Sequence, residues 1–317
     1  MSFLAFRGFL ASILALAWLS AVHAQAQYPS KPIRIIVPAA PAGALDITTR
    51  LVADKMREVL GQQVIVENRA GADTLLGTRY VKDAPSDGYT ILAQANGFTA
   101  LPAIRRDAGY EPLKDFMPVG MMVRAPSLML VSASAPDGSV PAFVERARRQ
   151  KLTYASAGVG GPPHLAAALF FRQAGVDMLH VPYKGNGPAL IDVAGGSVPV
   201  IFSGYSSAAP YLKSGKLRAV GVTSVQRIGQ LPEVPTFQEQ GVNYTYYFWL
   251  GLVAPRGTPS EAIQRLSEAV RYAVNSKELK ERFNSEGSEP VSWSSGEFAG
   301  YLRDEANQMR DLKLDEK

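Results

Sequence analysis

The segment IRIIV at residues 33–37, followed by PAAPAGALD at 38–46, decides the fold class. The run of β-branched residues predicts a buried strand, and the apolar spacing from Leu45 to Leu60 predicts an amphipathic helix after it. The small residues and prolines between them predict a tight loop. A strand, a loop and a helix in this order make up half of a βαβ unit, in which the two strands are parallel.

The same alternation continues along the chain. Further strands are predicted at 64–66, 89–93, 127–132, 152–155, 178–181, 198–203, 217–223 and 247–253. Further helices are predicted at 75–84, 141–150, 163–174, 187–194, 207–214, 259–275, 277–286 and 295–312. The pattern predicts an α/β protein with parallel-rich sheets that helices cover on both faces. A chain of 317 residues is long enough for two lobes, and its composition shows no flexible linker between them.

The composition excludes several classes of protein. Apolar residues make up 47% of the chain and charged residues 19%, which indicates a packed core and excludes a disordered chain. The chain has no cysteine, which excludes a disulfide scaffold, a cysteine-ligated zinc site, an iron–sulfur cluster and a thiol nucleophile.

The first 26 residues have the pattern of a secretory signal peptide. Arg7 precedes an apolar run at 9–22, and small residues at Ala24 and Ala26 offer cleavage sites. An N-terminal membrane anchor is the alternative, but the run is short for a bilayer. We therefore expect an exported, periplasmic protein. Without the signal peptide the chain has 32 basic and 28 acidic residues, dispersed without a basic face, so we expect an anionic small-molecule ligand and no nucleic acid.

Two strand-to-helix loops are candidates for anion binding. The first is the segment 38–46, and the second is YASAGVGGPPHL at 154–165. Small residues let the backbone approach a ligand, and a helix N-terminus offers free N–H groups to a carboxylate. Ordinary tight loops are the alternative for both. If both bind, we expect backbone N–H groups to dominate recognition, and we expect Gly160→Asp to abolish binding while leaving the fold largely intact. Strain is the alternative: a positive φ at Gly160 would make an aspartate there cost stability.

The sequence contains no complete nucleotide-binding or catalytic motif. The second loop approaches the dinucleotide pattern G-x-G-x-x-G, but Pro163 stands at its last position. GYSSA at 204–208 approaches a nucleophile elbow, but every histidine precedes Ser206, whereas that hydrolase fold needs one after it. His164 and His180 alone are too few for a metal site, so we expect His164 to shape the pocket and His180 to be a hydrogen-bonded core residue. We expect no enzyme activity, cofactor or metal.

Many ordered segments now support a family resemblance. The chain resembles the Bug-type periplasmic substrate-binding subunits of the tripartite tricarboxylate transporters, the TctC-like proteins. The resemblance rests on YPSKPIRIIVP at 28–38, the P-x-G-x-x-D-x-x-x-R pattern at 41–50, GQQVIVENRAGA at 61–72, APSDGYTIL at 84–92, YASAGVGGPPHLAA at 154–167, HVPYKGNGPAL at 180–190, GKLRAVGVTSVQR at 215–227, LPEVPTFQEQG at 231–241 and LVAPRGTP at 252–259.

The resemblance implies a two-lobed periplasmic binding protein of type II, the Venus-flytrap fold, with two crossovers between its lobes. It implies a lobe I of residues 27–125 plus 252–317 and a lobe II of residues 126–251. The expected function is capture of a small aliphatic or aromatic mono- or dicarboxylate in the cleft and delivery to the membrane permease subunits. We expect a monomer. A ligand-sensing subunit of a membrane signalling system is the alternative, and a periplasmic hydrolase is a weaker one.

The ligand-binding residues that the resemblance and the loops imply lie in two loops and after two strands. They are Pro41, Ala42, Gly43, Ala44, Asp46, Asn96, Ser156, Gly158, Gly160, Gly161, His164 and Ser203. Two departures from the family pattern matter: Ala42 stands in what is usually a glycine pair, and Ser203 stands where relatives often have aspartate. The cleft then has one negative charge fewer, which disfavours a ligand amine and favours a plain or aromatic carboxylate.

Overall fold

The computed structural model describes residues 28–312, so the predicted signal peptide at 1–26 lies outside the described residues. The strands are β1 (Ile33–Val37), β2 (Val64–Asn68), β3 (Thr90–Ala95), β4 (Phe116–Pro126), β5 (Leu128–Ser132), β6 (Leu152–Ser156), β7 (Met178–Pro182), β8 (Ile201–Ser203), β9 (Leu217–Val222), β10 (Tyr247–Pro255) and β11 (Glu289–Pro290). The helices are α2 (Ala44–Leu60), α3 (Leu75–Lys82), α4 (Gly97–Ile104), α5 (Pro112–Asp115), α6 (Val140–Arg149), α7 (Pro162–Gln173), α8 (Asn186–Ala194), α9 (Tyr205–Lys213), α10 (Ser260–Asn275), α11 (Lys277–Ser285) and α12 (Ser295–Leu312).

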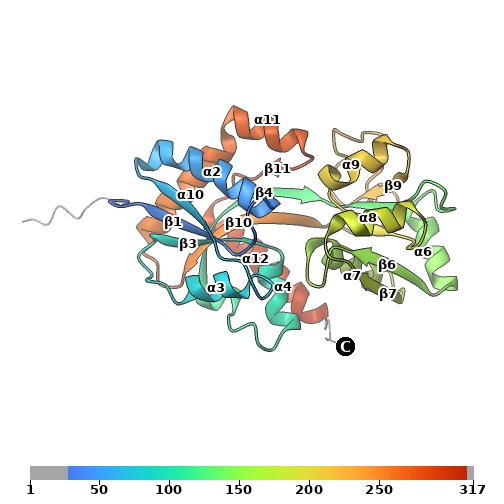
Figure 1. Cartoon of the computed structure of the whole chain (residues 1–317), viewed down its shortest axis with the longest axis horizontal. Coiled ribbons are helices and arrows are strands. Elements are labelled where there is room, and N and C mark those ends of the chain that lie inside the picture. Colours follow the sequence, from blue (N-terminus) through green and yellow to red (C-terminus); the bar gives the residue numbers. More distant parts are fainter. Residues whose placement is uncertain (1–27, 313–317) are drawn as a thin grey trace, which may run out of the picture.

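The strands form two sheets that lie side by side along the longest axis of the molecule (Figure 1). The sheet of lobe I has the order β11-β4-β10-β3-β1-β2, and the sheet of lobe II has the order β7-β6-β8-β5-β9. The two-lobed α/β fold that the sequence predicts is confirmed. Both sheets are mixed rather than rich in parallel pairs, because β10 is antiparallel to β3 and β4, and β5 is antiparallel to β8 and β9.

Two crossovers connect the lobes and are hydrogen-bonded to each other. The first is Ser127, between β4 and β5, and the second leads from β9 to β10. The buried Thr223 hydroxyl accepts from the Ser127 backbone N–H at 2.8 Å and donates to the Tyr246 carbonyl at 2.6 Å. The predicted lobe boundary after residue 125 lies at the end of β4. The one after residue 251 lies inside β10, which pairs within lobe I from Tyr247 onward, so we propose that lobe II ends before that strand.

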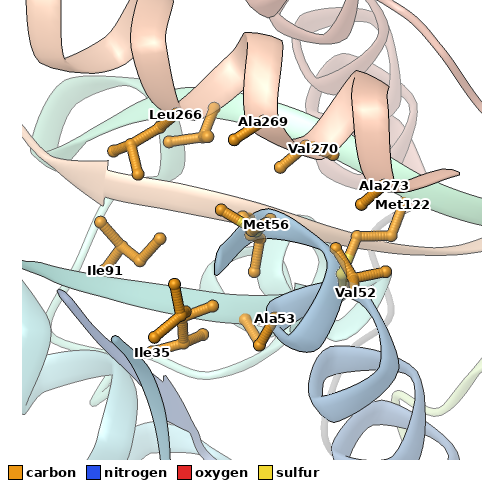
Figure 2. Packing of buried hydrophobic residues seen from close by; sticks show 14 of the residues in the cluster. Ile35, Val52, Ala53, Met56, Ile91, Met122, Leu266, Ala269, Val270 and Ala273 are labelled. Carbon is orange, nitrogen blue, oxygen red and sulfur yellow. The ribbon is translucent and has the colours of Figure 1, made fainter. Parts of the chain in front are cut away.

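Segments from the N-terminal and the C-terminal parts of the chain together build the core of lobe I. Val52 and Met56 of α2 and Val270 of α10 pack over Ile35 of β1 and Ile91 of β3, and all five side chains are fully buried (Figure 2). Burial of an aliphatic side chain of this size contributes about 1.5–3 kcal/mol. This packing fixes α2 against the sheet, so that its N-terminus lies just beyond the carboxyl end of β1.

The core of lobe II has helices on both faces of its sheet. Phe170 of α7 packs with Phe202 of β8 on one face, and Leu190 of α8 packs with Ala155 of β6 on the other. Two residues from elements of the first lobe, Ala100 of α4 and Met309 of α12, join the cluster under α7. The sequence pattern predicted neither α4 nor β4. The contact that Ala100 of α4 adds between the lobes was therefore not revealed by the periodicity.

Among residues 28–312, no helix combines the length and the apolarity needed to cross a bilayer.

Candidate functional site

Each lobe has a topological switch point at the carboxyl ends of its parallel strands. In lobe I, β1 lies between β2 and β3, and the helices that follow β1 and β2, α2 and α3, pack on opposite faces of the sheet. In lobe II, β6 lies between β7 and β8, with α7 and α8 on opposite faces. Loops diverge at such points and leave a crevice, which is where open α/β sheets bind ligands. Both predicted loops lie at these points.

Helix α4, which follows β3 of lobe I, lies against the second loop of lobe II. A Cβ atom built on Gly97, where α4 begins, would lie 4.0 Å from the carbonyl oxygen of Gly160 in the second loop. A Cβ atom on Gly160 would lie 3.2 Å from Cδ1 of Ile104, at the other end of α4. We use the name interlobe site for the first loop (38–46), the second loop (156–164) and the segments 183–187 and 203–207.

Asp46 holds the first loop together through hydrogen bonds with three residues. Its buried carboxylate accepts from the backbone N–H of Ala42 at 3.0 Å, from Arg50 Nε at 3.0 Å and from Asn68 Nδ2 at 2.9 Å. The hydrogen bond from Arg50 is the largest cause of the lowered pKa of Asp46, which stays ionised. With these partners, Asp46 positions the loop rather than presenting a charge to a ligand.

The first loop leaves its helix N-terminus open. Pro41, Ala42, Gly43 and Ala44 are exposed, and Gly43 is the N-cap of α2 with no side-chain cap. Within the described part of the chain, the backbone N–H groups of residues 43–45 have no protein acceptor. The helix dipole adds a partial positive charge at this end. The first loop therefore offers free donors to an anion.

The second loop uses two of its backbone donors internally. Pro162 and Pro163 occupy the first two positions of α7, after the N-cap Gly161, and have no N–H. The N–H of Gly160 donates to Nδ1 of His164 at 3.1 Å, and the N–H of Gly158 donates to the Ser156 hydroxyl at 3.1 Å. The two loops look alike in sequence, but the second loses two donors to proline and uses two more internally. The backbone N–H groups of Ala157, Val159, Gly161 and His164 have no acceptor among the described residues.

A pair of stacked histidines supports the second loop. The rings of His164 and His180 lie 4.1 Å apart between centroids, and His180 Nε2 lies 2.6 Å from the Ser156 hydroxyl. Burial lowers the pKa of both to about 4, and the neighbouring His180 contributes to the shift of His164. Both rings are therefore neutral at neutral pH. His180 is hydrogen-bonded as expected, but it lies half-buried on the edge strand β7 rather than in the core.

Asn96, predicted to line the cleft, has its side-chain polar groups bound within the protein. It is fully buried, and its Nδ2 donates to Glu305 at 2.7 Å and to the Tyr247 carbonyl at 3.2 Å. Its Oδ1 accepts from the backbone N–H of Trp249 at 3.0 Å. Burial raises the pKa of Glu305 to about 7, against the opposing effect of its hydrogen bonds. Asn96 thus ties β3 to β10 and α12.

Ser203 remains as a polar group without a partner. It is fully buried at the end of β8, and its hydroxyl has no hydrogen bond within the described residues. Oδ1 of Asn186 also lacks a partner there, while its Nδ2 lies 3.3 Å from the Ser207 hydroxyl. Sequence reasoning missed Asn186 and Ser207, although Asn186 stands in the glycine-flanked segment GNG before α8, which is a signal for a loop that approaches a ligand.

Within residues 28–312, no three histidine, aspartate or glutamate side chains gather in a way that would hold a metal ion.

Comparisons with known proteins identify the family of the chain. Residues 48–314 match the family described as the tripartite tricarboxylate transporter family receptor. Protein BugT of Bordetella pertussis is 32% identical over 301 residues, covering 92% of this chain and 91% of its own. The solved structure of Rpa4515 from R. palustris with adipate is 31% identical with a TM-score of 0.76, and it aligns with 90% of this chain and 97% of its own. MatC from Rhodopseudomonas palustris with bound malate is 30% identical with a TM-score of 0.75, over 90% of this chain and 100% of its own. The chain therefore belongs to the tripartite tricarboxylate transporter family of receptors, as a Bug-type, TctC-like solute-binding protein.

Proposed function

We propose that this protein is a periplasmic receptor that binds a small organic carboxylate at the interlobe site and delivers it to the membrane subunits of a tripartite tricarboxylate-type transporter. The observation that carries the proposal is the open N-terminus of α2, with the unpartnered N–H groups of residues 43–45. The bound adipate and malate in two relatives support a carboxylate ligand. The signal-peptide pattern of residues 1–26 supports the compartment.

The proposal divides the predicted site residues into two groups. Gly43, Ala44 and Ser203 are proposed to contact the ligand directly, with Pro41 and Ala42 shaping the loop around it. The other predicted residues are proposed to hold the backbone around the site in place. They are Asp46, Asn96, Ser156, Gly158, Gly160, Gly161 and His164. Because the cationic side chain of Arg50 is bound to Asp46, recognition at the first loop rests on backbone N–H groups.

Ligand binding by the purified chain from residue 27 onward tests the proposal. Thermal melts and isothermal titration would use aliphatic and aromatic mono- and dicarboxylates, and mass spectrometry would follow each compound during incubation. We expect one-to-one binding of an unchanged carboxylate; a ligand at 100 times its Kd adds about 2.7 kcal/mol to the free energy of unfolding. If no carboxylate binds, or if a product accumulates, the proposal fails.

Delivery to a transporter needs a separate measurement. Cells that express the receptor with its two membrane subunits would be supplied with the radiolabelled ligand. We expect uptake only when all three proteins are present. If binding occurs but deletion of the receptor leaves uptake unchanged, the role is sensing rather than transport.

A further inference from the structure

One residue of the first loop has a backbone conformation that its own side chain disfavours. Ala42 has a φ of +64°, in the left-handed region, which is strained for a residue with a Cβ atom. The φ and ψ angles of Ala42 set the direction of the next backbone N–H, that of Gly43, which is the first of the free donors. Strain of this kind persists only where the surrounding contacts hold it. The direction of the free donors therefore depends on the contacts that hold Ala42.

Asn68, which the sequence did not mark as a site residue, is bound to this loop at two points. It is the last residue of β2 and lies opposite Val37, the last residue of β1, in the parallel register. Its Nδ2 donates to the Ala39 carbonyl at 3.1 Å and to Asp46 Oδ1 at 2.9 Å. Asp46 in turn accepts from the Ala42 N–H at 3.0 Å. Asn68 is thus joined to the start of the loop directly and to Ala42 through Asp46.

Arg50 joins Asn68 and Asp46 into a closed set of hydrogen bonds. Its Nη2 donates to Asn68 Oδ1 at 2.8 Å, and its Nε donates to Asp46 Oδ1 at 3.0 Å. Arg50 and Asp46 are the charged side chains bonded to Asn68, and their charges are opposite. Asn68 uses its NH₂ group for two acceptors and its oxygen for one donor at once, which neither a carboxylate nor an apolar side chain can do. We call Asp46, Arg50 and Asn68 the loop clamp.

We propose that Asn68 is a positioning residue for ligand binding: through the loop clamp it holds Ala42 in its left-handed conformation and so directs the free N–H groups of residues 43–45 toward a carboxylate. The inference rests on the proposed function and adds to it a residue outside both loops. Asn68 acts through Asp46 and the Ala39 carbonyl and does not itself contact the ligand. Arg50 alone is enough to neutralise Asp46, so the distinct contribution of Asn68 is to fix the start of the loop.

A double-mutant cycle tests the link between Asn68 and Ala42. Isothermal titration would use the acid that binds most tightly in the panel that tests the proposed function, with adipate, malate, benzoate and terephthalate among its members. We expect Asn68→Ala to weaken binding about tenfold, because the loop then relaxes from the strained conformation. Starting from Ala42→Gly, the same change should weaken binding at most about threefold, since glycine adopts a positive φ without strain. Gln63→Ala, just before the opposite end of β2, is the control and should bind as the wild type does.

Asn68→Asp gives a readout that a merely structural role would not move. The second carboxylate oxygen of the aspartate would face Asp46 and the Ala39 carbonyl, where Nδ2 donated. Two adjacent carboxylates raise the pKa of one of them, and the proton taken up on acidification restores a donor between them. We expect the ratio of variant to wild-type Kd to be about ten at pH 8 and about three or less at pH 5.5. Measuring both proteins at the same pH cancels the titration of the acid itself.

Three results would overturn the inference and leave the proposed function standing. The first is an equal loss of affinity from Asn68→Ala with alanine and with glycine at position 42. The second is unchanged binding by Asn68→Ala in a protein whose melting temperature shows that it is folded. The third is a ratio for Asn68→Asp that does not change with pH. If no acid of the panel binds the wild type, the proposed function itself fails, and this inference fails with it.

Discussion

The two loops of the interlobe site have the same sequence design and different hydrogen bonding. Both follow a parallel strand, both consist of small residues and proline, and both lead into a helix. At the first loop, the helix begins with Ala44, Leu45 and Asp46, each of which has a backbone N–H. The Asp46 carboxylate accepts from the Ala42 N–H and so holds the loop in place. At the second loop, Pro162 and Pro163 remove two N–H groups. Anion binding at a helix N-terminus therefore depends on which N–H groups stay free, and not on the small-residue pattern alone.

The difference gives each loop a distinct role. The free donors of the first loop suit direct contact with a carboxylate. The second loop has its Gly160 N–H bound to His164 and lies beside Ile104 of α4, so we expect it mainly to shape the site. Three substitutions test this division, in order of decreasing effect.

Gly43→Asp should give the largest effect and should act on binding alone. The backbone of Gly43 has a φ of −77°, and a Cβ atom there would lie 3.6 Å from its nearest neighbour, the Ala40 carbonyl oxygen, so a side chain fits. An aspartate at the N-cap takes up the free N–H groups and repels an anion. We expect a loss of affinity of more than a hundredfold by titration, with an unchanged or slightly raised melting temperature.

Gly43→Ala is the matched control for this variant. It adds a Cβ atom at the same place without a charge or an acceptor, and we expect its affinity to stay within about threefold of the wild type, since an N-cap alanine leaves the N–H groups free. Normal affinity in a well-folded Gly43→Asp protein would remove the first loop from the ligand site.

Gly160→Asp should act on stability first, which revises the expectation from the sequence. Gly160 has a φ of +74°, a region that strains any residue with a Cβ atom, and that atom would lie 3.2 Å from Ile104. We expect a loss of about 2 kcal/mol in the free energy of unfolding, measured in urea. Gly160→Ala should lose a similar amount, because strain and not charge is the cause. Full stability of both variants, with binding lost in Gly160→Asp alone, would restore the second loop as an anion site.

The fold was predictable where its periodicity is regular. The helix predicted at 295–312 has those bounds in the structure, because its periodic apolar residues, Phe298 and Leu302 among them, are buried. The strand predicted at 178–181 differs by one residue. The stretch 97–126 was not predictable in the same way. Pro118 and Gly120 interrupt β4, and Pro102 lies inside α4, so local propensity argues against elements that tertiary packing imposes.

The two switch points were predictable from the sequence, and the hydrogen bonds around them were not. The strand-and-loop pattern located both switch points because the carboxyl ends of parallel strands meet at one edge. The role of Asn96 depends on Glu305, a residue 209 positions away, and no local pattern reveals that partner. Similarly, the engagement of the Gly160 N–H depends on the ring orientation of His164, which the stacked His180 helps to set.

The smallest of the three effects is on the pH dependence of stability, through His164 of the second loop. Burial lowers the pKa of His164 from about 6.5 in an unfolded chain to about 4 in the folded protein, so the folded state favours the neutral ring. As the pH falls below 6.5, the unfolded chain takes up a proton that the folded protein resists, and stability is lost progressively down to about pH 4. Between pH 7 and pH 5.5, this one residue should lower the free energy of unfolding by about 1 kcal/mol.

His164→Gln keeps an acceptor for the Gly160 N–H but does not titrate, so its free energy of unfolding in urea should fall by about 1 kcal/mol less than that of the wild type over the same interval. Comparing the two proteins cancels the carboxylates and His180, which both contain. Equal losses in the two proteins would mean that the His164 ring is protonated as easily in the folded state as in the unfolded one, and then it does not hold the second loop as a neutral acceptor.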